Sequence, residues 1–154
     1  MIRVVLDTNV LMSAAINPKG TPAQVLAAWR DGAFALLVSQ PILEELDRVS
    51  HYPKLVKYHQ WPDQRIRNFI VDLKHLAILT PGKTQLSVIE EDPSDNRYLE
   101  CAVEGKADCI VSGDQHLLDL EVYQDVRIVN PRAFLDLVST RSDEEQTTAE
   151  EEPR

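Results

Sequence analysis

The short run from Ile2 to Leu6 constrains the fold more than any other segment, and it leads directly into Asp7. Such a β-branched, apolar run predicts a strand buried on both faces, at the centre of a sheet that helices cover. Similar short segments recur along the chain, separated by amphipathic stretches with helix start and stop signals. The expected strands are 2–6, 34–38, 76–79, 109–111 and 127–129, and the expected helices are 21–31, 39–49, 62–73, 92–103, 116–120 and 131–137. This alternation predicts an α/β fold, a three-layer sandwich around a central parallel β-sheet.

Length and composition predict one domain over residues 1–139. The chain has 154 residues, enough to bury a single core without metal or disulfide staples. Its two cysteines form neither a disulfide framework nor a thiolate zinc site. No apolar run approaches the roughly 18–20 residues of a membrane helix, and the N-terminus does not resemble a signal peptide. We therefore expect a cytoplasmic protein with no membrane association.

The net charge of −9 is unevenly distributed along the chain. Residues 141–154 contain six acidic residues and two arginines, so they hold −4 of that total. This stretch has no aromatic residue, Leu, Ile or Val, and the composition predicts a disordered acidic tail over residues 140–154. The overall charge argues against nucleic-acid binding less strongly once the tail is set aside.

Four acidic residues are expected at one edge of the sheet. Asp7 follows the first strand, and Asp114 follows the strand 109–111 after one turn. Glu45 lies early in the helix after the strand 34–38, and Asp95 lies in the first turn of the helix before 109–111. The carboxyl ends of parallel strands meet at the edge where ligands bind, so these side chains should converge.

Two explanations for these acids are open. Each acid alone fits a structural role, because a carboxylate at a helix N-terminus caps the helix and favours its dipole. Four carboxylates from separate segments in one crevice repel each other unless a cation is present. Oxygen ligands without a cysteine or histidine set favour Mg²⁺, with Mn²⁺ as the other option.

Four blocks of the sequence resemble PIN-domain proteins of the toxin–antitoxin type. They are residues 4–11 with Asp7-Thr8-Asn9, 39–46 with Glu44-Glu45-Leu46, 92–102 with Asp95, and 107–118 with Ser112-Gly113-Asp114. The blocks occur in the family's order and spacing over about residues 2–137. The first block alone is a weak signal, whereas the four together are specific.

The resemblance implies a sheet of order 3-2-1-4-5 and a metal-dependent endoribonuclease that hydrolyses RNA. It implies catalytic roles for Asp7, Glu45, Asp95 and Asp114, of which Asp7, Asp95 and Asp114 bind the metal. Thr8, Asn9 and Ser112 would be polar supports. The neighbour Glu44 is the alternative to Glu45 as second acid. The resemblance also implies RNA as a partner, a cognate antitoxin protein and a homodimer.

A basic and aromatic segment covers residues 48–61 and separates two expected helices. Arg48, Lys54 and Lys57 are candidates for substrate binding, because cations pair with phosphates and nearby aromatic rings stack on unpaired bases. The alternative is a solvated connector over 51–61 whose aromatic residues pack onto the domain. His116 is expected to have a structural role.

Other functions compete with the nuclease. Haloacid-dehalogenase-like phosphatases also place an Asp after the first strand, but they need a second Asp where this chain has Asn9. A non-catalytic RNA- or protein-binding module on the same fold is an alternative, although all four acids are present. A housekeeping RNA-processing nuclease is another alternative to a toxin.

Overall fold

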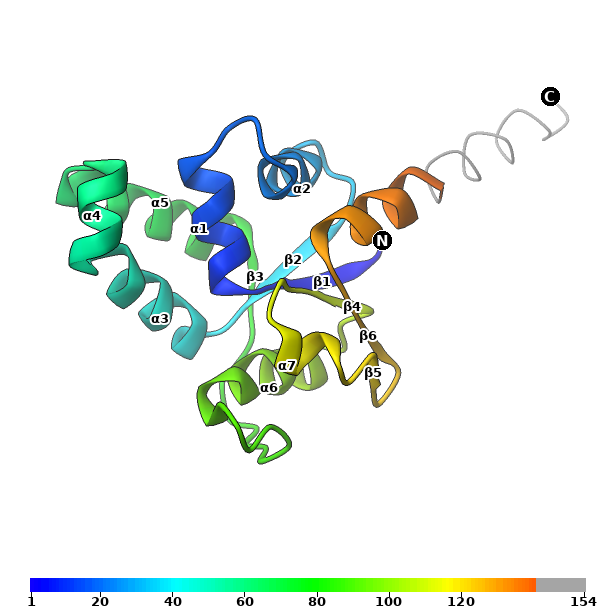
Figure 1. Cartoon of the computed structure of the whole chain (residues 1–154). Helices are drawn as coiled ribbons and strands as arrows, with labels where there is room; N and C mark the ends of the chain where they lie inside the picture. Colours follow the sequence, from blue (N-terminus) through cyan, green and yellow to red (C-terminus); the bar gives the residue numbers. More distant parts are fainter. Residues whose placement is uncertain (141–154) are drawn as a thin grey trace, which may run out of the picture.

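The computed structural model describes residues 1–140 (Figure 1). Within them, a six-stranded sheet has the order β3-β2-β1-β4-β6-β5. Its strands are β1 (Arg3–Leu6), β2 (Ala35–Val38), β3 (Ile78–Leu79), β4 (Cys109–Val111), β5 (Val122–Tyr123) and β6 (Val126–Val129). Every pairing is parallel except that of β5 with β6. The predicted parallel sheet is confirmed, and the short antiparallel strand β5 extends it at one edge.

The helices follow most of the predicted boundaries. They are α1 (Thr8–Ile16), α2 (Thr21–Arg30), α3 (Gln40–Ser50), α4 (Pro53–His59), α5 (Asp63–Leu76), the 3-10 turn η1 (Pro93–Asp95), α6 (Asn96–Glu104) and α7 (Gln115–Leu118). Residues 131–140 are also helical. Helix α1 was not predicted, and the expected connector over 51–61 contains the helix α4.

Alternating strand residues build two separate cores, one on each face of the sheet. In β1, Val4 and Leu6 belong to one apolar cluster and Val5 to the other, because successive side chains of a strand point to opposite faces. Residues of α1, α2, α3, α5 and the helix over 131–140 complete the first cluster, and α6 and α7 complete the second. Figure 1 shows the sheet between α1 and α2 on one side and α6 and α7 on the other. The three-layer sandwich is therefore confirmed.

The sheet brings the ends of β1 and β4 side by side. Leu6 is in register with Val111, and the backbone N–H of Asp7 continues the pairing by donating to the Val111 carbonyl at 3.0 Å. Asp7 and Ser112 thus leave adjacent strands at the same level. This is the edge at which α1 and α3 begin (Figure 1).

Other features predicted from the sequence are the acidic tail, the apolar length of the helices and the state of the two cysteines. The predicted acidic tail lies, apart from Thr140, outside the described residues. Among residues 1–140, no helix combines the length and the apolar character needed to span a membrane. Both cysteines, Cys101 and Cys109, are buried.

Candidate metal centre

Asp7 is a buried carboxylate that holds local structure together. It is 3% exposed and caps α1 by accepting from the Asn9 backbone N–H through Oδ1 at 2.8 Å. Its Oδ2 accepts from the Ser112 hydroxyl at 2.6 Å. Burial raises the pKa of Asp7, while the hydrogen bonds from Ser112 and Asn9 oppose that rise. The capping role considered above is therefore real, and both carboxylate oxygens already have one donor each.

Ser112 connects the first acid to the last. Its side chain is fully buried, and its Oγ accepts from the Asp114 backbone N–H at 2.9 Å while it donates to Asp7. Asp114 in turn caps α7 by accepting from the His116 N–H through Oδ1 at 2.8 Å. The predicted support residue Ser112 thus fixes the position of Asp114 relative to Asp7.

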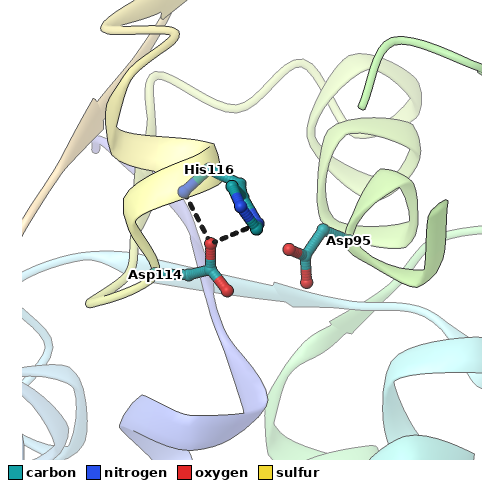
Figure 2. Close-up of side chains that lie close together, drawn as sticks. All are labelled: Asp95, Asp114 and His116. Atoms are coloured by element: carbon teal, nitrogen blue, oxygen red, sulfur yellow. Dashed lines mark hydrogen bonds and ion pairs between the residues drawn. The ribbon is translucent and has the colours of Figure 1, made fainter. Parts of the chain in front are cut away.

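Asp95, Asp114 and His116 form a cluster of metal-binding size (Figure 2). One potential ligand atom from each lies within 4.8 Å of the other two. Asp95 comes from η1 on one side, whereas Asp114 and His116 come from the start of α7 on the other. The His116 ring nitrogen Nδ1 lies 3.7 Å from Asp114 Oδ1. Figure 2 shows the Asp95 carboxylate facing these two side chains.

Asp95 is a buried carboxylate whose surroundings would favour a cation. It is 7% exposed, and its Oδ2 is buried without a hydrogen-bond donor from any residue in the described range 1–140. Burial, followed by repulsion from Asp114, Asp92 and Asp7, raises its pKa to about 7. An orphaned buried oxygen is costly, and a divalent cation would both satisfy it and offset the repulsion. The carboxylate oxygens of Asp95 and Asp114 suit Mg²⁺ or Mn²⁺, so the two acids fit the implied metal, whereas the imidazole of His116 is not a typical ligand of Mg²⁺.

The three predicted metal ligands do not occupy equivalent positions. Asp95 and Asp114 lie together in the cluster, whereas Asp7 lies outside it and is tied to it by Ser112 and by its electrostatic effect on Asp95. His116 joins the cluster, although the sequence indicated only a structural role for it. The sequence did contain a signal for this role of His116. His116 lies two positions after the N-cap residue Asp114, in the same turn.

Glu45 of α3 lies close enough to Asp7 to affect its pKa and forms ion pairs with two arginines. Its side chain is 17% exposed, and its Oε2 forms ion pairs with Arg48 of the same helix and with Arg97 of α6. Its charge also contributes to the raised pKa of Asp7. The neighbouring Glu44 is exposed and accepts from Gln40 at 3.5 Å. This placement favours Glu45 over Glu44 as the second acid.

The remaining predicted supports differ in their environment. Thr8 is 2% exposed, and its hydroxyl accepts from the Tyr98 Oη at 2.8 Å. Burial raises the pKa of Tyr98, so the phenol keeps its proton. Asn9 is exposed and contributes its backbone N–H to Asp7. The sequence did not single out Arg97 or Tyr98, since their partners are 52 and 90 residues away.

The predicted substrate-binding residues differ in how close they lie to the four acids. Arg48 contacts Glu45, while Lys54 and Lys57 are exposed on α4, at the far end of α3 (Figure 1). Helix α4 has no buried residue, and Tyr58 on it is 72% exposed. Trp61 is packed instead, with the Arg65 guanidinium 4.2 Å from its ring centre. The segment therefore keeps an exposed cationic surface next to a packed aromatic residue.

Comparison with known proteins places this site in a family. A family model described as the PIN domain matches residues 3–116, which include β1, α3 and all four acids. The chain is 34% identical over 119 residues to "Uncharacterized protein MJ1680" of Methanocaldococcus jannaschii, covering 77% of this chain and 75% of the relative. The chain belongs to the PIN-domain family. PIN domains form a nuclease superfamily whose members generally depend on a divalent metal.

Proposed function

We propose that the protein is an endoribonuclease that hydrolyses RNA phosphodiester bonds with Mg²⁺, or with Mn²⁺ in its place. The observation that carries this proposal is the buried Asp95, whose carboxylate lies beside Asp114 and His116 and whose Oδ2 has no donor among residues 1–140. A carboxylate with a purely structural role would have both of its oxygens satisfied by protein donors. An oxygen kept free inside a crowded anionic site indicates a cation site.

The residues of the site have different roles in the proposed hydrolysis. Asp95 and Asp114 would hold the metal, and His116 lies beside them. Asp7 would add a further negative charge next to this site. When bound, the ion would neutralise charge on the phosphoryl oxygens and promote attack by water. Ser112 fixes Asp7 and Asp114 relative to each other. Glu45 has Oε2 engaged by two guanidinium groups, which hold its carboxylate between α3 and α6 as the second acid of the site.

The proposed role in the cell, as distinct from the activity, rests on the resemblance to toxin–antitoxin nucleases. In this role the protein would be a toxin that cuts cellular RNA, held inactive by a cognate antitoxin and working as a homodimer. Lys54 and Lys57 would contact RNA phosphates away from the metal. Induced expression in a host cell would arrest growth if this role holds, and an Asp7→Asn variant would not.

Cleavage of RNA by the purified chain tests the proposed activity. Wild type should cut single-stranded RNA with Mg²⁺ or Mn²⁺ and lose activity in EDTA. Asp95→Asn should reduce the rate at least about a hundredfold, the scale expected for losing one group that stabilises charge in a transition state. The matched control Asp125→Asn changes an exposed acid in the turn between β5 and β6, and its rate should equal that of wild type. Undiminished cleavage in EDTA would overturn the proposal.

A further inference from the structure

A cavity lined in part by Arg97, the ion-pair partner of Glu45, has no assigned role in the proposed hydrolysis. It has a volume of about 340 Å³ and lies between the start of α3, the segment 82–87 and α6. Ser39, at the carboxyl end of β2, lines it together with Arg97 and Glu100 of α6. The volume falls in the range of small-molecule sites, roughly 300–1,000 Å³. The cavity therefore lies along the same carboxyl edge of the sheet as the acids.

One wall of this cavity is irregular backbone that α6 holds in place. Asn96, Glu100 and Glu104 are spaced one turn apart and accept hydrogen bonds from backbone N–H groups of residues 82–89. The donors are Gly82, Lys83, Thr84, Leu86, Val88 and Ile89. These three side chains satisfy backbone N–H groups that a neighbouring strand would otherwise satisfy. They therefore hold this wall of the cavity in a defined conformation.

Two charged side chains of α6 give the cavity its chemistry. Arg97 lines the cavity while its guanidinium also pairs with Glu45, so it joins the cavity to the second acid. Its Nε donates to the Ser94 carbonyl at 2.7 Å, which fixes the plane of the guanidinium. Glu100 accepts from the Leu86 N–H through Oε2 at 2.8 Å, whereas its Oε1 has no donor within residues 1–140. The cavity therefore offers a cation near the acids and a free carboxylate oxygen one turn farther along.

We propose that the cavity binds the nucleotide of single-stranded RNA next to the bond that is cut. The phosphate of that nucleotide contacts Arg97, and its base donates an amino hydrogen to Glu100 Oε1. Guanine fits because its exocyclic amino group, on the edge that proteins read in unpaired RNA, can donate to this one oxygen. A base without an amino group, uracil, fits worst. This inference rests on the proposed nuclease function for the direction of the RNA along the sheet edge.

Titration of the ¹⁵N-labelled full chain with mononucleotides, in EDTA, tests the cavity independently of cleavage. GMP should shift the amide signals of residues 39, 84–87 and 97–100, and it should bind about tenfold more tightly than UMP, as one charge-assisted hydrogen bond provides. Glu100→Gln keeps an acceptor for the Leu86 N–H but removes the charge, so it should abolish the GMP preference. Arg97→Gln should weaken GMP binding to the level of guanosine. Asp125→Asn should bind GMP like wild type.

The results separate this inference from the proposed activity. Equal binding of GMP and UMP, or shifts away from the cavity, would overturn the inference even if the protein cleaves RNA. Nucleotide binding as described with no RNA cleavage would overturn the proposed activity and leave the cavity a nucleotide site. A short guanosine-containing RNA should displace GMP from the cleavage-impaired Asp95→Asn variant. Failure to compete would show that the cavity takes free nucleotides and not RNA.

Discussion

Replacing Asp95 with Asn should stabilise the metal-free protein while it abolishes the metal response. The carboxylate is buried, one of its oxygens has no donor among residues 1–140, and it lies beside Asp114. Its pKa rises from 3.8 to about 7 on folding. Asparagine keeps the shape, removes the charge and supplies an N–H₂ group that can donate to Asp114. The usual cost of a core substitution is therefore absent.

The size and sign of the effect follow from linkage. A rise of about three pKa units at 1.36 kcal/mol each corresponds to at most about 4 kcal/mol. The folded state binds the Asp95 proton more tightly than the unfolded chain, so ionisation costs stability as pH rises from about 4 to about 7. The cost is complete above pH 7 and vanishes below pH 4, and at pH 5 it is less than about half its full value.

Urea denaturation in EDTA measures this difference directly. At pH 8 the Asp95→Asn variant should unfold with a higher free energy than wild type, and the gap should shrink by more than half at pH 5. Mg²⁺ at ten times its dissociation constant should then stabilise wild type by roughly 1.4 kcal/mol and the variant by much less. The Asp125→Asn control should behave like wild type. A variant less stable than wild type at pH 8 in EDTA would refute the reasoning and make Asp95 a structural carboxylate.

Three further predictions concern the second acid, helix α4 and the acidic tail. Glu45→Gln should slow RNA cleavage at least tenfold more than Glu44→Gln, since adjacent helix positions point about 100° apart; kinetics with the reverse ranking would transfer the role to Glu44. Replacing Lys54 and Lys57 with Ala should weaken RNA binding and lower the salt dependence of log K by about two; an unchanged salt slope would remove α4 from the RNA path. Deleting residues 141–154 removes a charge of −4 and should leave the melting temperature unchanged without weakening RNA binding; a large drop in melting temperature would contradict the composition argument.

The sequence predicted those elements whose apolar residues follow a clear period. Helices α3 and α5 bury one face each, and the spacing of their apolar residues predicted both. Helix α1 buries Val10, Leu11 and Met12 in succession and is apolar nearly all round, so no period distinguishes it from a strand or a loop. Helix α4 buries nothing, which removes the signal altogether. Strand β5 has only two residues and depends on pairing with β6.

The candidate site was predictable as far as strand topology determines it. Asp7 and Asp114 follow strands that are neighbours in a parallel sheet, and this relation alone brings them to one edge. The ion pair between Glu45 and Arg97 joins α3 to α6, and no local pattern specifies such a contact. The sequence also could not show that Asp7 has both carboxylate oxygens engaged while Asp95 has one free. That difference depends on side-chain packing.

The central claim is that Asp95 and Asp114 hold a divalent metal. Crystals grown with Mn²⁺ would test it through anomalous scattering at the manganese edge. The account predicts one strong peak between the two carboxylates, at a ligand distance from Asp95 Oδ2 and next to His116, and no such peak in crystals of Asp95→Asn. A fully occupied manganese that contacts neither carboxylate, or no manganese at all at millimolar concentration, would contradict it.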